Sequence, residues 1–413
     1  MTSDSHTDVL LIGGGIAAAS AAEALREGGF EGRVVLVTRE LDPPYHRPPA
    51  SKEHLRGEQG QDDALILPAA WWDEHGVELR TRTGVLSLDP AAKRVKLQTK
   101  EELTFDRALV ATGAMVRRLV VPGSGLEGIH YLRSLRNADS LRRDLEGLAD
   151  DAPIVLVGGS YIGTEVAASL AAQGRPVTIL ALEDEPLERT FGTEIGRWVR
   201  ARLEAHGIAF RGGAEVASFA NAEGGDGEGR VAAVVLADGE RIPAELVVAG
   251  VGATPDAMLA KRAGLELGET GGVAVDRFLR TSAEGIWAAG DVAEYESVLD
   301  LHPERLRVEH EEHAAAQGAY VARRWLGEEE PFQEVPYFFS DLADWVSLEA
   351  LGPAHGWDRT VLQGSLDDDA FAVWFLAGDR AVGYASFNGA GDLDAAREVL
   401  AAGEPVDAAA LAG

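Results

Sequence analysis

The chain has 413 residues, 46% of them hydrophobic, which is enough for two or three domains with buried cores of their own. It contains no cysteine, so a disulfide scaffold, a thiolate metal site and electron relay through a protein dithiol are excluded. Its formal net charge of −30 disfavours nucleic acids and anionic membranes as partners, because both would repel it.

The first predicted elements are a strand, a glycine-rich turn and a helix. The apolar residues 9–12 indicate a buried strand, and an alanine-rich helical stretch follows the turn. A strand that turns sharply into a helix whose N-terminal amides face a pyrophosphate requires small residues at the turn. Gly13 would allow the turn, Gly15 would let the backbone approach the phosphates, and Ala18 would let the helix pack on the strand.

A second strand is predicted over residues 34–37, and two charged residues after it are candidates for the ribose site. Glu40 stands near the roughly 20-residue spacing at which a carboxylate receives the ribose hydroxyls. Arg39 occupies the place where many such sites have an acid, so both residues remain candidates. The proline-rich residues 43–52 are unsuited to a helix or a central strand, and we expect a stiff loop there.

The strand–turn–helix pattern recurs after residue 153. Short strands over residues 76–97 and a buried strand running into a glycine turn at residues 111–113 are predicted before it. Gly158, Ser160 and Gly163 stand at the three small-residue positions of the second turn. One such turn is weak evidence, but two in register indicate two bound dinucleotides.

The second pattern also contains a signal for coenzyme choice. Its second strand, residues 177–180, is followed by an acidic segment that includes Glu183. A carboxylate there accepts ribose hydroxyls and repels a 2′-phosphate, so NADH is favoured over NADPH. Arg175 and Arg189 are close enough in sequence to keep NADPH open.

The order of these elements predicts an α/β fold with one dinucleotide-binding domain inserted into another. Both domains are expected to be Rossmann-like, and a small α+β domain is expected at the C-terminus. The first domain would comprise residues 1–116 and 247–327, the inserted domain residues 117–246, and the C-terminal domain residues 328–413.

Six motifs in this order resemble the FAD-dependent NAD(P)H ferredoxin reductases of oxygenase systems, with rubredoxin reductases and apoptosis-inducing-factor-like flavoproteins close by. The motifs lie at the two glycine turns and at residues 45–52, 111–113, 252–255 and 289–291, and residues 336–341 extend the match. The resemblance covers nearly the whole chain. It implies FAD at the first glycine turn and a nicotinamide nucleotide at the second.

The resemblance also implies which residues contact the two cofactors. Lys52 and Glu165 would form an ion pair beside the flavin N5 edge, where hydride arrives, so that the ammonium stabilises the charge that develops there. An ordinary helix residue near an N-terminus is the alternative interpretation of Glu165. The expected cofactor-binding residues are Gly13, Gly15, Ala18, Arg39, Glu40, Arg47, Lys52, Val85, Ala111, Thr112, Gly113, Gly158, Ser160, Tyr161, Ile162, Gly163, Glu183, Gly252, Gly290, Asp291 and Phe339.

Three positions depart from the family pattern. Ser160 stands where relatives usually have a glycine, and a serine side chain is small enough for this position. Glu311 and Phe339 each stand where relatives commonly carry tryptophan. The first of these two replacements removes an aromatic ring that could cover the nicotinamide or shield reduced flavin.

The histidines and tryptophans receive structural interpretations. His302, His310 and His313 lie in one helical or prehelical region, and a helix packed near the flavin explains them better than a metal site with Glu309. We therefore expect no metal. Trp345, Trp357 and Trp374 are expected in the core of the third domain or over the flavin.

The expected function is electron transfer from NADH or NADPH through FAD to a ferredoxin-type iron–sulfur protein that serves an oxygenase. The alternatives are an NADH oxidase or quinone-type reductase, and a non-catalytic NADH-sensing flavoprotein. Docking an acidic ferredoxin would require a local basic patch. The candidates are Arg197, Arg200 and Arg202, or Arg323 and Arg324, although solvated helix faces are the more common explanation of such residues. We expect a cytoplasmic protein, monomeric or homodimeric, without a membrane span or a signal peptide.

Overall fold

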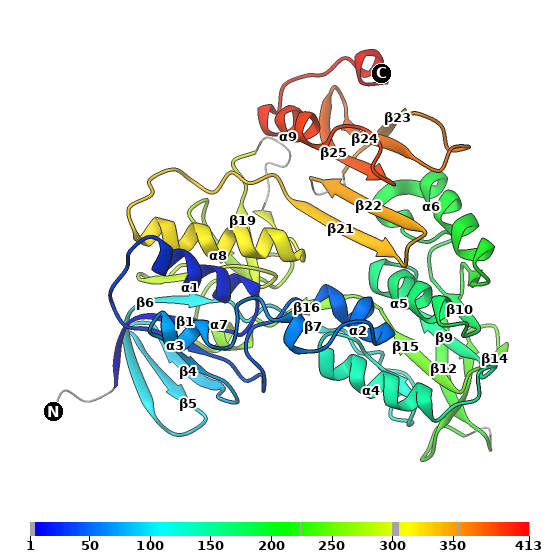
Figure 1. The fold of residues 1–413 in the computed structure, drawn as a ribbon, viewed down its shortest axis with the longest axis horizontal. Coiled ribbons are helices and arrows are strands. Elements are labelled where there is room, and N and C mark those ends of the chain that lie inside the picture. Colours follow the sequence, from blue (N-terminus) through cyan, green and yellow to red (C-terminus); the bar gives the residue numbers. More distant parts are fainter. Residues whose placement is uncertain (1–4, 224, 300–304, 353–355, 413) are drawn as a thin grey trace.

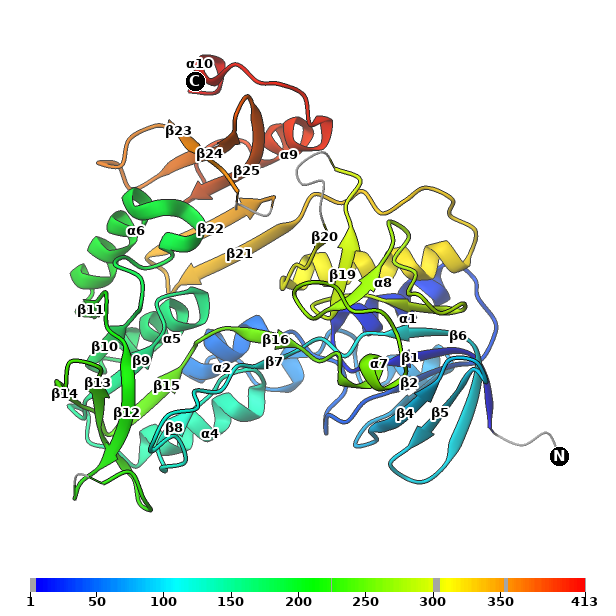
Figure 2. The ribbon, with the colours of Figure 1, turned by 180° about the vertical axis from the view of Figure 1, so that it is seen from behind.

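The computed structural model describes residues 5–223, 225–299, 305–352 and 356–412. Their helices and strands form three units, which Figures 1 and 2 show from opposite sides. The first unit contains both the N-terminal strands and residues from the middle of the chain. The second lies between those two parts in sequence, and the third is C-terminal. This arrangement confirms the predicted fold class.

The first unit is built on a sheet whose parallel strands have the order β3-β2-β1-β6-β18. A hairpin, β4 and β5, continues the sheet from the first half of β6 in antiparallel register. The four residues of β2 are all buried, as expected for a parallel strand covered on both faces. The strands are β1 (His6–Ile12), β2 (Val34–Val37), β3 (Val77–Arg80), β4 (Val85–Asp89), β5 (Arg94–Leu97), β6 (Glu102–Val110) and β18 (Ile286–Ala288).

Two long helices, α1 (Ile16–Glu27) and α8 (Glu311–Trp325), lie side by side on one face of this sheet (Figure 1). A Cβ atom at Gly318 would lie 1.9 Å from the carbonyl oxygen of Ala17, so only glycine allows the two backbones to approach so closely. The smaller elements are α3 (Trp71–Glu74), α7 (Met258–Arg262) and a sheet of β17 (Val273–Val275), β19 (Ala293–Glu296) and β20 (Arg305–Leu306).

The second unit has a parallel sheet of the order β11-β10-β9-β15-β8. Three helices pack around it, and an antiparallel sheet of β12, β13 and β14 extends the unit. The bounds are β8 (Ile129–His130), α4 (Leu135–Glu146), β9 (Ile154–Val157), α5 (Tyr161–Ala172), β10 (Val177–Leu180), α6 (Glu188–Ala205), β11 (Ala209–Arg211), β12 (Val216–Asn221), β13 (Val231–Leu236), β14 (Arg241–Pro243) and β15 (Leu246–Ala249).

The expected boundary between residues 246 and 247 cuts through β15, so it needs correction. This strand pairs with β9 on one side and β8 on the other, and it therefore lies inside the second sheet up to Ala249. The chain crosses between the units in an antiparallel pair, β7 (Ala114–Val116) with β16 (Ala253–Pro255). These two crossings place the insertion, in structural terms, between residues 117 and 252.

The third unit is an antiparallel sheet of the order β21-β22-β25-β24-β23 with two short helices. One face packs on α6 through phenylalanine rings and Trp198, and the other face is covered by α9. Asp392 caps α9 by accepting hydrogen bonds from two amides of its first turn. The elements are β21 (Tyr337–Leu342), β22 (Val346–Leu351), β23 (Arg359–Gln363), β24 (Phe371–Ala377), β25 (Arg380–Phe387), α9 (Leu393–Ala402) and α10 (Ala408–Leu411).

The expected stiff loop at residues 43–52 contains one 3₁₀ turn, η1 (Pro48–Ser51), followed by α2 (Glu53–Arg56) and, further on, η2 (Asp62–Ala64). Ala50 and Leu55 are buried in the core that the second unit shares with the third. The loop therefore leaves the first unit and carries Lys52 to the second. Among the described residues, no helix combines the length and the apolar character needed to cross a bilayer.

Candidate functional site

A cavity of about 1350 Å³ lies where the three units meet. It exceeds the roughly 300–1,000 Å³ of an ordinary small-molecule pocket, so it has room for more than one ligand group. Of the predicted cofactor-binding residues, most line it: Gly13, Gly15, Arg39, Glu40, Arg47, Lys52, Val85, Ala111, Thr112, Gly113, Ser160, Tyr161, Ile162, Gly252, Gly290, Asp291 and Phe339, together with Glu165. Ala18, Gly158, Gly163 and Glu183 do not.

The first glycine turn has the geometry that a dinucleotide phosphate site requires. Gly13 has φ of +133°, and a Cβ atom there would lie 2.0 Å from the carbonyl oxygen of Ala111. At Gly15, by contrast, a Cβ atom would meet no described atom within 4 Å, so the turn opens into the cavity. Gly15 is also the N-cap of α1, and its first turn carries no acidic residue. The free amides of that turn fit the pyrophosphate of FAD.

The second turn repeats this construction at the start of α5. Gly158 has φ of +115°, and a Cβ atom there would lie 2.2 Å from the carbonyl oxygen of Gly250. A Cβ atom at Gly163 would lie 1.9 Å from the carbonyl oxygen of Gly158, so this glycine packs the helix on the strand. Ser160, the N-cap, makes no capping hydrogen bond to the helix. These residues fit a second dinucleotide, although two of the three act behind the cavity wall.

The two ribose candidates of the first site have different partners. Glu40 accepts hydrogen bonds from the Tyr45 hydroxyl, at 2.8 Å, and from the Arg47 guanidinium. Arg39, whose side chain is 63% exposed, forms an ion pair with Asp256 at 2.8 Å. Two donors thus hold the Glu40 carboxylate at the cavity wall, whereas the Arg39 guanidinium pairs with Asp256. We therefore favour Glu40 for the ribose.

In the second site, Glu183 forms an ion pair with Arg189. Arg175 lies elsewhere: it donates to the carbonyl oxygens of Leu145 and Ala149, near the end of α4. Of the two arginines that kept NADPH open, only Arg189 therefore lies beside Glu183.

Lys52 and Glu165 are brought together in the wall of the cavity, in the pair that the resemblance implies. Their side chains are 4% and 8% exposed, and Nζ lies 3.8 Å from Glu165 Oε1. A second carboxylate, Asp341, lies closer, with Oδ2 3.0 Å from Nζ. The Phe339 ring covers the ammonium, with its centroid 4.2 Å from Nζ.

Two hydroxyl groups complete this cluster, which we call the Lys52 cluster (Ser51, Lys52, Glu165, Ser340 and Asp341). Ser51 donates to Glu165 Oε2 at 2.5 Å, and Ser340 donates to Oε1 at 2.7 Å. Burial raises the pKa of Glu165, while the nearby ammonium and the two hydroxyls oppose that rise. The cluster joins all three units at one point. Sequence reasoning missed the two serines and Asp341.

The predicted histidine region is an interior contact beside the cavity. His310 is the N-cap of α8, and its ring stacks on Phe338 with centroids 4.2 Å apart. Burial lowers the pKa of His310 to about 4 and that of His313 to about 3, so both rings are neutral at pH 7. Glu309 pairs with Arg307 instead of joining them. His302 lies outside the described residues.

A buried hydrogen-bond chain, which the sequence did not reveal, fixes the loop at Gly290. Gln317 Oε1 accepts from the Gly290 amide at 2.8 Å, and its Nε2 lies 3.1 Å from His313 Nε2. Next in the loop, Asp291 accepts from Arg133 at 2.7 Å. The only sequence signal for this chain is that Gln317 follows His313 by one helical turn.

The predicted docking arginines all have carboxylate or carbonyl partners. Arg197 and Arg200 pair with Glu185, Arg202 pairs with Asp369, Arg323 pairs with Glu328, and Arg324 donates to the Glu328 carbonyl. The tryptophans belong to the third unit: Trp374 is buried in its core, Trp345 stacks on His206 and Trp357 donates to the Thr190 carbonyl. None of these three rings lines the cavity.

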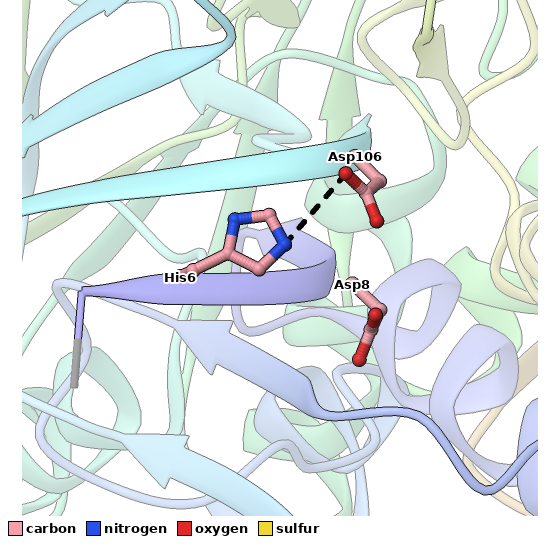
Figure 3. A group of neighbouring side chains, drawn as sticks. All are labelled: His6, Asp8 and Asp106. Carbon is pink, nitrogen blue, oxygen red and sulfur yellow. Dashed lines mark ion pairs between the residues drawn. The ribbon is translucent and has the colours of Figure 1, made fainter. Parts of the chain in front are cut away.

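One more group of titratable side chains lies away from the cavity. His6 and Asp8 on β1 face Asp106 on β6 (Figure 3). His6 bonds to the Thr104 hydroxyl at 3.0 Å, and Asp8 accepts from the Arg33 amide at 2.6 Å. These contacts connect the start of β1 to β6 and to the residue that precedes β2, which is a sufficient structural explanation.

Comparison with known proteins gives two family matches that together cover most of the chain. Residues 7–318 match the pyridine nucleotide-disulphide oxidoreductase model, and residues 337–413 match the reductase C-terminal model. Rhodocoxin reductase of Rhodococcus erythropolis is 33% identical over 398 residues, covering 96% of this chain and 90% of that protein.

Two further comparisons concern electron carriers. The ferredoxin–NAD(+) reductase component of the biphenyl dioxygenase system of Paraburkholderia xenovorans is 36% identical over 356 residues, 86% of this chain and 83% of that protein. The reductase of the covalent putidaredoxin reductase–putidaredoxin complex superposes with a TM-score of 0.91 at 30% identity, covering 99% of this chain and 96% of that one.

Proposed function

The chain belongs to the pyridine nucleotide-disulphide oxidoreductase family, and on that basis we propose that it is a reductase that passes electrons from NADH through FAD to a ferredoxin-type iron–sulfur protein. One observation carries this proposal: Gly15 and Ser160, which begin two helices without a side-chain cap, line a single cavity together with Lys52 and Glu165.

The first unit, with Gly15, Glu40 and Asp291, would hold FAD, and the second unit, with Ser160 and Glu183, would hold the nicotinamide nucleotide. When bound, FAD accepts a hydride from the reduced nicotinamide and releases electrons singly. The residues of the chain position the two ligands and exclude water. Because the chain has no cysteine, electrons cannot pass through a protein dithiol and must leave from the flavin.

In the Lys52 cluster, the ammonium places a positive charge at the cavity wall where negative charge would develop. Its two carboxylate partners and the Phe339 ring restrict its movement, so its position is fixed before the reaction begins. Glu165 is a positioning residue, because its hydrogen bonds with Ser51 and Ser340 orient it toward Lys52. Neither carboxylate requires a change in protonation for this role.

NADH is the proposed coenzyme because Glu183 follows β10, the second strand of the unit, where a carboxylate would accept ribose hydroxyls and repel a 2′-phosphate. Arg189 partly neutralises this carboxylate, so the preference rests on one acidic side chain. The electron acceptor is proposed to be a ferredoxin, as in the name of the Paraburkholderia xenovorans relative.

The proposal is tested by the flavin content of the purified protein and by the choice of acceptor. The holoprotein should carry FAD, and NADH should bleach its yellow colour anaerobically faster than NADPH does. Reduced protein should then be reoxidised by a ferredoxin faster than by dioxygen or a quinone. Faster reoxidation by dioxygen would identify an oxidase, and a long-lived reduced complex that no acceptor oxidises would identify an NADH sensor.

A further inference from the structure

Glu311 occupies an unusual position in the cavity wall. It is the first residue of α8, and its side chain is only 13% exposed. One carboxylate oxygen, Oε1, lies 2.6 Å from His46 Nδ1, which belongs to the loop that carries Lys52. The His46 contact and the helix fix the carboxylate from two sides, so it cannot easily turn to find other partners.

The second oxygen of this carboxylate has no partner. Glu311 Oε2 is buried and finds no hydrogen bond within the part of the chain that the structure describes. Only one other buried carboxylate oxygen there shares this property, Glu185 Oε2, but Arg200 lies 3.7 Å from it and Glu185 does not line the cavity. A buried acceptor left unpaired is destabilising, and more so when it is charged. A hydrogen-bond donor from a bound molecule would therefore stabilise Glu311 Oε2.

Its protein neighbours do not supply that donor. His46 is already bound to Oε1, and the His310 ring stacks on Phe338. The adjacent Glu312 is an acceptor when ionised, and burial with the Glu311 charge raises its pKa. Glu311 lines the cavity, so a molecule bound there is the remaining source of a donor.

We propose that Glu311 is a ligand-binding residue whose Oε2 accepts a hydrogen bond from an amide-type N–H group of the molecule that fills the cavity. This inference rests on the proposed function, in which that molecule is FAD or the nicotinamide nucleotide. Both carry such a group: the flavin has an imide N–H, and the nicotinamide has a carboxamide. A charged acceptor with one fixed oxygen favours a ligand that presents a donor and penalises one that does not.

The test uses the full-length protein and two dissociation constants. FAD binding to the apoprotein is measured by quenching of flavin fluorescence, and NAD⁺ binding to the oxidised holoprotein by its absorbance change. Glu311→Leu should raise one of the two constants about tenfold or more, as expected for loss of a hydrogen bond to a charged group. A rise for FAD identifies the imide as the donor, and a rise for NAD⁺ identifies the carboxamide.

The matched control is Glu312→Leu, which removes the same charge one residue later in the same helical turn. It should change the affected constant much less than Glu311→Leu. An equal effect of the two substitutions would overturn the inference, because loss of charge at the helix N-terminus would then explain both. Unchanged constants in Glu311→Leu would overturn it as well.

Ligand analogues test the same hydrogen bond in the unmutated protein, so misfolding of a variant does not obstruct the experiment. FAD methylated at its imide nitrogen and acetylpyridine adenine dinucleotide each lack one of the two N–H donors. The natural protein should bind one analogue about tenfold more weakly than its parent, and Glu311→Leu should abolish that discrimination. Equal binding of both analogues and their parents would contradict the inference. A natural protein that binds neither FAD nor NAD⁺ would instead contradict the proposed function.

Discussion

Lys52 has two carboxylate neighbours, Asp341 at 3.0 Å and Glu165 at 3.8 Å, in surroundings almost closed to water. Replacing it with methionine keeps the length of the side chain and removes its charge. We expect Lys52→Met to slow flavin reduction by NADH on the order of a hundredfold, the usual effect of removing one preorganised electrostatic group. Bound FAD should be retained. Anaerobic stopped-flow bleaching of the flavin measures this rate.

A loss of stability must be separated from this effect, because Lys52→Met leaves Glu165 buried without its ammonium partner. Removing one partner of a buried ion pair lowers the free energy of unfolding by roughly 3–5 kcal/mol. The double variant Lys52→Met/Glu165→Gln removes the unpaired charge and should recover most of the stability without recovering the rate. A single variant that reduces its flavin as fast as the natural protein would remove Lys52 from the mechanism.

The pH dependence of stability should reveal the burial of Glu165. Its pKa in the folded protein is raised above the ordinary value of 4.5, mainly by desolvation. A raised pKa favours folding while the carboxyl is protonated, and that contribution disappears as the pH rises through the folded value. The unfolding free energy of the natural protein, relative to Glu165→Gln, should therefore fall as the pH rises above the ordinary value of 4.5. Denaturant titrations of both proteins measure this difference in unfolding free energy. A difference that rises with pH would contradict the burial of Glu165.

Coenzyme preference should depend on Glu183. Glu183→Gln removes the repulsion of a 2′-phosphate and frees Arg189 to bind it, so the ratio of kcat/KM for NADPH to that for NADH should rise about tenfold. Arg189→Ala, the control, should not raise this ratio. No change in the glutamine variant would mean that the preference is set elsewhere in the site.

Residues with local signatures were predictable, and residues that act across domains were not. Lys52 and Glu165 were paired only because the resemblance to ferredoxin reductases suggested it. Asp341 lies 289 positions from Lys52 in sequence, and no spacing rule indicates that the third unit would supply a second carboxylate. Ser340 and Asp341 lie in the motif at residues 336–341, but their contacts depend on how β21 packs against α5.

At the level of elements, the two glycine turns are the best-determined features, since their requirements are those of the backbone. Gly13 has a φ that other residues avoid, and a Cβ atom there would lie 2.0 Å from the carbonyl oxygen of Ala111. Gly15 has an ordinary φ of −94°, and a Cβ atom there would meet only open space. Gly13→Ala should therefore destabilise the fold by at least about 1–3 kcal/mol. Gly15→Ala should fold normally but bind FAD more weakly, because its methyl group would enter the space proposed for the phosphates.

Thermal melts of the two apoproteins and FAD titrations of the folded variants distinguish these expectations. An apoprotein of Gly15→Ala that melts as low as that of Gly13→Ala would show that the turn is constrained in ways the geometry does not indicate.

Strand β15 illustrates what local patterns leave undetermined. Its four apolar residues fit the interior of either parallel sheet, and sequence alone assigned most of them to the first. Its pairing with β9 and β8 places it in the second sheet, and such pairing depends on the tertiary fold. The 3₁₀ turn inside the proline-rich loop was likewise invisible, although Pro48 and Pro49 at its start are compatible with it.

At the scale of the whole molecule, the fold class was predictable because two strand–turn–helix patterns and an alternating C-terminal segment specify it. The packing of the third unit was not. Its sheet rests on α6 through Trp198 and a group of phenylalanines, and such contacts between distant segments have no signature in periodicity. This packing brings β21 to the cavity and so completes the Lys52 cluster.

The central claim is that a flavin bound in this cavity takes electrons from NADH and gives them to a ferredoxin. A double-mixing stopped-flow experiment tests it directly: the oxidised holoprotein is first reduced anaerobically with one equivalent of NADH and is then mixed with oxidised ferredoxin. The account predicts bleaching of the flavin in the first step, followed by its recovery together with reduction of the iron–sulfur cluster in the second. A flavin that stays yellow with NADH, or purified protein that binds no flavin at all, would contradict it.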